Sequence, residues 1–358
     1  MAGIARQPVL TLVLFVMLQN PPGAEPPLHR YEVTETHMGS EFKIILYSLD
    51  EVAARRASRA AFDRIARLDA SFNDYQPESE LMKLCERAGG PPVAVSADLF
   101  NILQQSKAMF ERSGGAFDVT VGPVVRLWRR SRRERKLPAK ETLERALSLV
   151  SSEFMTLDSK TKTVRLAKPG MKLDLGAIAK GYASDAAVQV LKEQGITRCL
   201  VAGAGDIVAG DAPPDSAGWT VGIAPLENPE SAPDRSFTLK NGAVSTSGDT
   251  ERFVEIAGKR YSHIVDSKTG LGKIDRSSVT VVANDGVTAD ALATAVYALG
   301  PDRGLALVEN IEGASAYVVR LEEKGKVTYE SKRFHSLPRA RKDALKTDFP
   351  VVGSAHHP

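Results

Sequence analysis

The chain has few cysteines, few aromatic residues and little excess charge of either sign. Only Cys85 and Cys199 occur among 358 residues, and no Cys or Cys/His spacing is typical of a metal site. A disulfide between them is one interpretation for an exported protein, but two buried thiols are favoured because free cysteine is so often a core residue. The net charge is +3, from 47 Lys and Arg against 44 Asp and Glu. A dedicated nucleic-acid binder normally has a larger basic excess, so no nucleic-acid partner is expected.

The apolar run near the N-terminus is also too short to be a permanent membrane anchor. Residues 8–18 are strongly apolar but too few to span a bilayer. They follow Arg6 and precede Pro, Gly and Ala residues, which is the order of a signal peptide. We therefore predict a signal peptide at residues 1–24 and export to the periplasm or another extracytoplasmic compartment. No cysteine lies near Ala24, so a lipid anchor on an N-terminal cysteine is not expected.

Apolar periodicity predicts helices and strands without a regular βαβ order, and this favours a mixed α+β fold with largely antiparallel sheets and packed helices. Helices are expected at residues 52–72, 97–113, 178–195 and 289–298. Strands are expected at residues 41–47, 154–157, 163–166, 173–175, 199–208, 219–223, 236–239, 261–265, 278–282, 314–320 and 327–330. Residues 338–358 form a polar stretch that we predict to be a disordered tail.

The basic run at residues 129–140 holds seven Lys or Arg and one Glu. One interpretation is a surface that meets anionic lipid or an acidic partner. The favoured interpretation is a solvated loop that leads to a helix starting at Pro138, because short charged runs are common on protein surfaces.

Residues 171–185 carry the strongest chemical signal in the chain. Alternating leucines lead to Gly176, and helical spacing follows. A strand-to-helix turn built from small residues lets backbone groups approach a phosphate, and Lys180 lies one turn inside the helix, where its charge can meet that phosphate. The pattern therefore indicates phosphate binding, although Lys180 could also be an ordinary solvated lysine.

About a hundred residues later, Asp290 and Thr294 are four apart in a helical pattern, so their oxygens share one face. A carboxylate and a hydroxyl together suit a hard cation. The plainer alternative is that Asp290 only favours the helix dipole, with Thr288 as the N-cap.

These segments resemble the ApbE family, the FAD:protein FMN transferases, over about residues 31–330. The family domain is accordingly expected at residues 31–335. Seven motifs occur in family order: residues 36–39 (THMG), 72–77 (FNDYQP), 115–123 (GAFDVTVGP), 173–185 (LDLGAIAKGYASD), 244–249 (VSTSGD), 263–270 (HIVDSKTG) and 289–294 (ADALAT).

The resemblance implies an exported enzyme that binds FAD and Mg²⁺, releases AMP, and joins FMN to a Thr or Ser hydroxyl of another protein. By motif, FAD would contact Met38, Tyr75, Ala116, Phe117, Asp118, Asp174 and Lys180. Mg²⁺ would be held by Asp290, Thr294 and the carbonyl of Ala177, and the base would be His263. The partners implied are FAD and an acceptor protein with a Ser/Thr flavinylation motif, and any membrane association would be peripheral, through that acceptor.

The residue types make chemical sense independently of the resemblance. Phosphoryl transfer depends on positioning and charge neutralisation, so a metal and a lysine are expected near a pyrophosphate. A weak hydroxyl nucleophile needs a base, and histidine with an ordinary pKa near 6.5 can accept a proton near neutrality. Tyr75 could stack on a flavin or adenine ring. The plainer alternatives are that Tyr75 and Phe117 are core residues, that Asp118 fixes a turn, and that His263 is structural.

The chain departs from the family pattern at residues 202–206 (AGAGD), where adjacent glycines are usual, and at residues 267–268 (SK), where Pro-Arg is frequent. Neither departure includes a predicted metal ligand, so both bear on FAD contacts. Two other functions remain open. One is a metal-dependent FAD pyrophosphatase that gives FMN and AMP, and the other is a non-catalytic FAD-binding protein.

Overall fold

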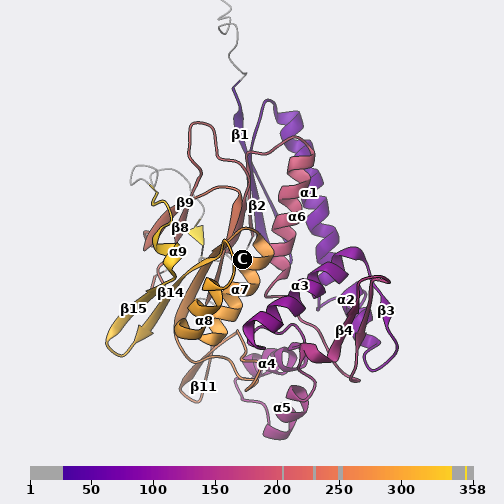
Figure 1. The fold of residues 1–358 in the computed structure, drawn as a ribbon. Helices are drawn as coiled ribbons and strands as arrows, with labels where there is room; N and C mark the ends of the chain where they lie inside the picture. Colours follow the sequence, from indigo (N-terminus) through magenta and orange to yellow (C-terminus); the bar gives the residue numbers. More distant parts are fainter. Residues whose placement is uncertain (1–26, 204, 229–230, 249–252, 341–350, 353–358) are drawn as a thin grey trace, which may run out of the picture.

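An eight-stranded antiparallel sheet forms the centre of the protein (Figure 1). The structure is a computed structural model and describes residues 27–203, 205–228, 231–248, 253–340 and 351–352. Each pair of neighbouring strands in the sheet is antiparallel, as predicted. In order across the sheet, the strands are β1 (His29–His37), β2 (Ser40–Ser48), β6 (Cys199–Gly203), β7 (Asp206–Ala209), β10 (Gly242–Gly248), β13 (Ser277–Ala283), β14 (Ser315–Glu322) and β15 (Gly325–Glu330).

Both faces of this sheet are covered, so its central strands have apolar side chains on both sides. In β2, Ile44 and Leu46 face one hydrophobic cluster and Ile45 faces another. This follows from the alternation of side chains along a strand. Helices α1 (Glu51–Phe72), α6 (Ala179–Glu193) and α7 (Gly286–Leu299) cover the first face, and α1 and α6 lie side by side (Figure 1).

A three-stranded sheet and a short helix cover the second face. The helix is α9 (Lys332–His335), and its Phe334 stacks on Tyr317 of β14 at 5.3 Å between ring centroids. The sheet has the order β16 (Val351–Val352), β8 (Trp219–Ile223) and β9 (Arg235–Leu239). The cavity described below lies on the α6–α7 side of the central sheet.

Several smaller elements complete the described part of the fold, and α8 among them packs against α7 and β14. They are α2 (Glu80–Glu86), α3 (Ala97–Ser113), α4 (Gly122–Glu134), α5 (Lys140–Leu147), the 3₁₀ turn Ser152–Phe154, α8 (Pro301–Glu309), a small sheet of β3 (Val93–Ala94), β5 (Thr163–Leu166) and β4 (Met155–Asp158), and the hairpin β11 (Phe253–Ile256) and β12 (Lys259–Ser262). Local sequence explains where several helices begin or end. Asp50 caps α1 by accepting from Ala53 N, and Gly114 ends α3 in the left-handed region at φ 60°.

The predicted strand at residues 173–175 is wrong. The segment is extended but pairs only at one bridge, between Lys172 and Val121. Leu173 and Leu175 are both buried, 1% and 2% exposed. Alternate burial of two leucines produced a strand-like pattern without a partner strand.

Two further expectations are corrected. The basic run at residues 129–140 begins as helix, because α4 extends to Glu134, and the next helix starts at Lys140 rather than Pro138. The predicted strand at residues 199–208 is two strands, β6 and β7, which pair as a tight hairpin. Apolar residues on both sides of the turn hid the reversal from a count of hydrophobic positions.

Cys85 and Cys199 are both buried and free, as favoured. Burial raises the pKa of both thiols, that of Cys199 to about 12, so they are inert core groups at neutral pH. Within the predicted tail, Val351–Val352 pairs in parallel with β8, and residues 341–350 and 353–358 lie outside the described part. The predicted signal peptide lies outside it too. No helix among the described residues is both long enough and apolar enough to span a bilayer.

Candidate active site

A cavity of about 720 Å³ lies where the starts of α6 and α7 meet the end of β10, α4 and the loops after α1 and α3. The structure brings all eleven residues singled out from the sequence to the wall of this one cavity. They are Met38, Tyr75, Ala116, Phe117, Asp118, Asp174, Ala177, Lys180, His263, Asp290 and Thr294. Their roles are not tested by this placement and stay predictions. These residues come from six separate segments of the chain, and only the tertiary structure brings the segments together.

Two glycines create the close approach at the centre of the site. A Cβ atom on Gly181 of α6 would lie 2.1 Å from the carbonyl oxygen of Gly286, and one on Gly286 would lie 2.6 Å from the carbonyl oxygen of Gly181. With no side chains there, the first turns of α6 and α7 touch, and Gly181 N donates a hydrogen bond to Asp290 Oδ2 at 3.1 Å. The helix carrying Lys180 is thereby fixed against the helix carrying Asp290.

The start of α7 is held by two aspartates rather than by Thr288. Asp285 is the N-cap and accepts from Thr288 N at 2.7 Å, so the expected Thr288 cap is wrong. Asp185 of α6 accepts from Gly286 N at 2.7 Å and from Val287 N at 3.0 Å. Burial raises the pKa of Asp185 to about 7, while these two backbone bonds act in the opposite direction.

An acidic centre lies beside Lys180. Asp290 and Asp206 are both 3% exposed, and Lys180 Nζ is 3.9 Å from Asp206 Oδ2. Burial raises the pKa of both carboxyl groups, and the nearby charge of Asp290 contributes to raising that of Asp206 to about 8. Asp206 Oδ2 makes no hydrogen bond to any described residue. Two buried carboxylates therefore share the charge of one lysine.

The carboxylates of Asp206 and Asp290 carry more negative charge than Lys180 balances, so this place suits a hard cation. Within the described ranges, no group of three or more His, Cys, Asp or Glu side chains is arranged as a metal site. A cation would therefore need carbonyl and hydroxyl oxygens as well as carboxylates, which suits Mg²⁺. Thr294 lies one turn after Asp290, and its hydroxyl is 3.1 Å from that of Ser247 at the end of β10. Ala177 lies in the turn just before α6.

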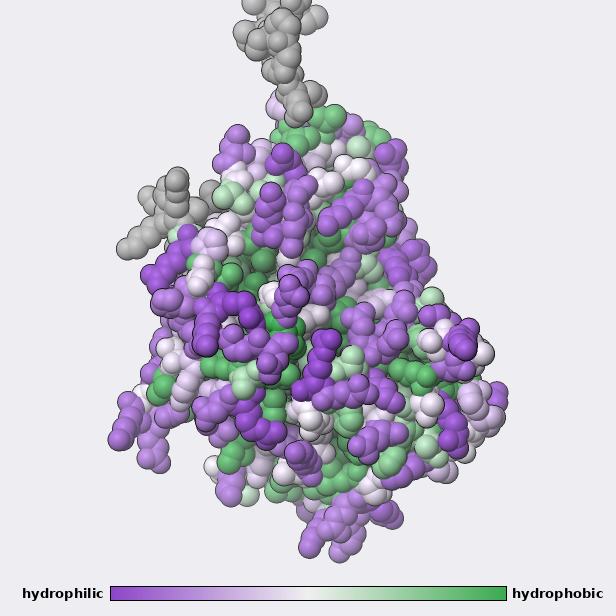
Figure 2. Space-filling model, viewed as in Figure 1, coloured by the Kyte–Doolittle hydropathy of each residue, from purple (hydrophilic) through white to green (hydrophobic). Residues whose placement is uncertain are grey.

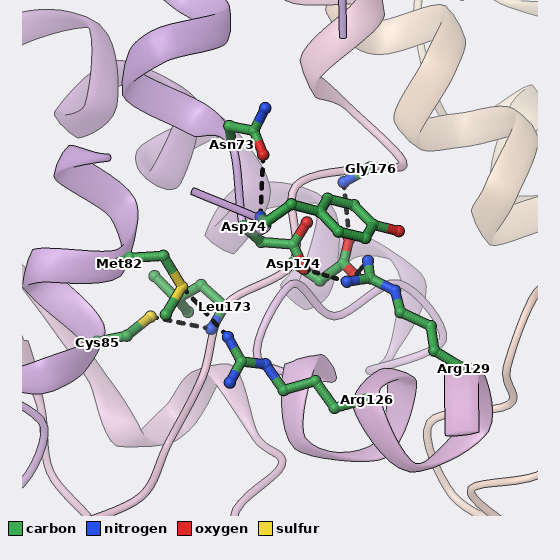
Figure 3. A network of polar contacts seen from close by, with 10 residues as sticks. Asn73, Asp74, Met82, Cys85, Arg126, Arg129, Leu173, Asp174 and Gly176 are labelled. Carbon is green, nitrogen blue, oxygen red and sulfur yellow. Dashed lines mark hydrogen bonds and ion pairs between the residues drawn. The ribbon is translucent and has the colours of Figure 1, made fainter. Parts of the chain in front are cut away.

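An arginine clamp closes the opposite side of the cavity and was not found from the sequence. Arg129 of α4 donates to Asp74 at 2.5 Å and to Asp174 at 2.8 Å, so one guanidinium joins two loops (Figure 3). Its Cζ atom lies 4.2 Å from the ring centroid of Tyr75, which is 73% exposed. In the sequence, Arg129 is only one member of the basic run at residues 129–140. The register of α4 decides which of these arginines points into the cavity. Tyr75 is therefore not a core residue.

Asp174 has opposing influences on its charge. Burial and the neighbouring charge of Asp74 raise the pKa of its carboxyl group, while Arg129 lowers it. One carboxylate oxygen also accepts from Gly176 N at 2.8 Å, which fixes the turn before α6. Asp174 thus couples the arginine clamp to the turn that presents Ala177.

Side-chain hydrogen bonds hold the loop after α3. Phe117 is 2% exposed, and its N–H donates to Ser113 Oγ at 3.0 Å. Asp118 accepts from the Thr120 hydroxyl and from the Ser152 hydroxyl, each at 2.7 Å. These bonds give Asp118 a structural role, and its place on the cavity wall also leaves the predicted contact with FAD open.

Met38 and His263 approach the cavity from two turns. Met38 is in the left-handed region at φ 52°, and its N–H donates to Asp69 at 2.8 Å, which fixes the turn between β1 and β2. His263 follows directly after β12. Trp128 of α4 donates from Nε1 to the carbonyl oxygen of Ser262 at 3.1 Å, and Ser262 N donates to Lys273 O at 2.7 Å. Lys273 N donates in turn to the carbonyl oxygen of Ile264 at 3.2 Å, so both neighbours of His263 are anchored.

The fold and the cavity define a ligand-binding α+β protein whose site has the residue types that phosphate groups and hard cations require. The sequence model of the ApbE family matches residues 38–318, and the chain belongs to that family. A protein of Klebsiella pneumoniae named FAD:protein FMN transferase is 33% identical over 293 residues, covering 81% of this chain and 89% of the relative.

Other comparisons agree with this assignment. A Treponema pallidum protein of the same name is 32% identical, covering 83% of this chain and 86% of its own length. The structure of the flavin transferase ApbE from Vibrio cholerae matches with a TM-score of 0.77 and 25% identity, covering 87% of this chain and all of the neighbour. The relatives are thus matched over nearly their full lengths.

Proposed function

We propose that this chain is an FAD:protein FMN transferase that uses Mg²⁺, releases AMP and attaches FMN to a Thr or Ser hydroxyl of an acceptor protein. The observation that carries the proposal is the single cavity lined by all eleven predicted residues, with two buried carboxylates beside one lysine. Family membership and the names of the relatives support the same activity.

The chemistry balances with the groups present. The acceptor oxygen attacks the phosphorus on the flavin side of the pyrophosphate, the bond between that phosphorus and the bridging oxygen breaks, and AMP leaves with the oxygen. His263 accepts the proton of the hydroxyl. Lys180 meets the pyrophosphate from the first turn of α6, where the helix dipole also favours negative charge. When bound, Mg²⁺ would neutralise charge on the pyrophosphate, held by Asp290, Thr294 and the carbonyl of Ala177.

The remaining residues would hold FAD in place. Tyr75 presents an exposed aromatic face at the mouth of the cavity, suited to stacking against a flat ring. Met38, Ala116 and Phe117 supply apolar wall, and the bonded carboxylates of Asp118 and Asp174 keep the loops around the ligand fixed.

We also place the reaction outside the cytoplasm, on the basis of the signal-peptide order of residues 1–24. If the acceptor protein lies at a membrane, the enzyme would associate with that membrane only peripherally, through the acceptor. Cell fractionation tests this, and a full-length protein confined to the cytoplasm would contradict it.

The decisive experiment incubates the purified protein with FAD, Mg²⁺ and a peptide containing Ser-Gly-Ala-Thr. AMP is measured by chromatography and the peptide by mass spectrometry. The proposal expects AMP and a peptide heavier by one FMN in equal amounts. AMP with free FMN and an unmodified peptide would indicate a pyrophosphatase, and FAD bound without AMP release would indicate a binding protein.

A further inference from the structure

A second hollow of about 870 Å³ opens beside the active-site cavity, and five of its ten lining residues are arginines. We call it the arginine groove. It is lined by Asp74, Tyr75, Arg126, Arg129, Arg132, Arg133, Arg135, Phe253, Val254 and Glu255. Asp74, Tyr75, Arg129 and Arg132 also line the active-site cavity, so the two hollows adjoin and share these residues.

The described residues that line the groove carry more positive than negative charge. Its five arginines face two carboxylates, Asp74 and Glu255, and Asp74 is already paired with Arg129. With the other residues that the structure describes, Arg132, Arg133 and Arg135 form no ion pair. Like charges that converge on a hollow repel one another, and an anionic partner would relieve this repulsion.

A plainer explanation of these arginines is that they form a solvated face of α4. Several of them lie at the C-terminal end of this helix, where cations meet the negative end of the helix dipole. The arrangement of the arginines is not fully explained by a solvated helix face. Arg133 and Arg135 are exposed, yet the five arginines together line one concave surface between α4 and the β11–β12 hairpin. The face in Figure 2 shows hydrophilic side chains gathered around recesses in which hydrophobic residues are visible.

The walls of the groove suit a polypeptide. Phe253 is 38% exposed, and Arg260 lies over its ring with Cζ 3.3 Å from the centroid. Tyr75 forms an exposed aromatic wall at the end shared with the active site. Aromatic faces alternating with guanidinium forks bind carboxylate side chains and the apolar groups between them. A flat bilayer surface cannot follow such a concave hollow.

We infer that the arginine groove binds an acidic segment of the acceptor polypeptide next to the hydroxyl that receives FMN. This inference rests on the proposed function, because a transferase must hold its acceptor while the hydroxyl reaches the cavity. Arg129 and Tyr75 line both the groove and the active-site cavity, so a chain lying in the groove would reach the proposed FAD site. The groove would thus select among hydroxyl-bearing segments by their neighbouring charge.

Two fluorescent peptides test the inference. They share a central Ser-Gly-Ala-Thr and are flanked by glutamates in one and by lysines in the other. Binding is measured by fluorescence polarisation with the FAD-loaded protein, and FMN attachment is measured separately by mass spectrometry. The glutamate peptide should bind at least about tenfold more tightly than the lysine peptide, and this preference should shrink as salt is raised.

The protein variants are R133E/R135E and the milder R133Q/R135Q, because these two arginines line the groove but not the active-site cavity. The matched control is R56E/R303E, with the same charge change at exposed positions outside both linings. Affinity for the glutamate peptide should fall about threefold with the Gln pair and about tenfold with the Glu pair, and not with the control. FAD affinity should be unchanged in all.

Equal binding of the two peptides, or equal losses in the groove and control variants, would overturn the inference. So would groove-dependent binding to vesicles of phosphatidylcholine and phosphatidylglycerol without any peptide preference, because it would make the surface a lipid contact. A separate failure is distinguishable. If the glutamate peptide binds through the groove but neither peptide gains FMN while AMP is released, the acidic preference stands and the transferase proposal fails.

Discussion

Asp290 is the residue in which packing and proposed chemistry meet. Its carboxylate is buried, accepts a hydrogen bond from Gly181 N, and lies near Lys180 and Asp206. Without a cation, such a group destabilises the fold because burial opposes its charged form. A buried carboxylate that destabilises the fold in this way is a candidate for a functional role rather than a stabilising one.

Replacing Asp290 by Asn keeps the oxygen that accepts from Gly181 N and removes the charge. AMP release from FAD should fall by roughly 10²-fold or more, because the proposed cation loses its carboxylate. Thermal unfolding gives an independent measurement. In EDTA the variant should be at least as stable as the unmodified protein, and only the unmodified protein should gain stability from MgCl₂. The exposed Asp302→Asn change is the control, and an equal Mg²⁺ response in Asp290→Asn would refute the metal assignment.

Replacing His263 by Ala should separate transfer from binding. FMN attachment should fall by about 10²–10⁴-fold, because the acceptor hydroxyl loses its base. FAD affinity, measured by quenching of flavin fluorescence, should stay within a few fold. His335→Ala, at an exposed histidine of α9, is the matched control. A large loss of FAD affinity with transfer nearly intact would show that His263 binds FAD instead.

At the scale of elements, α4 joins the two sides of the active site. Its Arg129 reaches Asp74 and Asp174, and its Trp128 holds the segment before His263. Trp128 also packs edge-on against Tyr261 of β12, with ring centroids 5.6 Å apart. The hairpin that precedes His263 is separate from the central sheet, and α4 packs against it and helps to fix its position.

Trp128→Phe keeps a large ring and removes the hydrogen bond to Ser262. We expect about 1 kcal/mol less stability and about tenfold slower FMN transfer, with little change in the KM for FAD. Trp219→Phe is a close control, because Trp219 is also buried and donates from Nε1 to a backbone oxygen, that of Asp211, at 3.0 Å. The control should lose similar stability but keep transfer. Equal transfer rates in both variants would remove the positioning role from Trp128.

At the scale of the whole molecule, three helices are joined by one carboxylate. Asp98 of α3 accepts from Arg64 of α1 at 2.5 and 2.6 Å and from the Tyr182 hydroxyl of α6 at 3.0 Å. The hydrogen bonds from Arg64 hold the pKa of Asp98 below its usual range. The same carboxylate, together with burial, raises the pKa of Tyr182 to about 12. Arg64, Asp98 and Tyr182 do not themselves line the active-site cavity.

The Asp98 junction predicts acid sensitivity. A lowered folded pKa contributes stability above the unfolded value of about 3.9, and that stability is lost as pH falls through the folded value. Asp98→Asn should therefore be about 1–2 kcal/mol less stable at pH 7, a figure kept small because the pair is partly exposed. The difference should vanish near pH 2. Urea unfolding at both pH values measures it, and an equal difference at both would exclude an electrostatic cause.

Much of the protein follows from local sequence. Apolar spacing located α1 and α3 to within two residues, and the antiparallel character of the sheet was predicted before its pairing was known. Ordered motifs identified the family and the residues that the structure then places around one cavity. These features are local because caps, periodicity and turn residues act over a few positions of the chain.

Only the tertiary structure decided how these residues act together. Asp206 and Arg129 were missed because neither stands out in sequence: one gains its significance from burial beside Asp290, the other from the register of α4 against two distant loops. The strand pattern at residues 173–175 misled for the same reason, since burial of alternate leucines does not require a partner strand. The charge balance, burial and pairing of a residue depend on segments that are distant in sequence but close in space. The sequence alone does not give these distances in space.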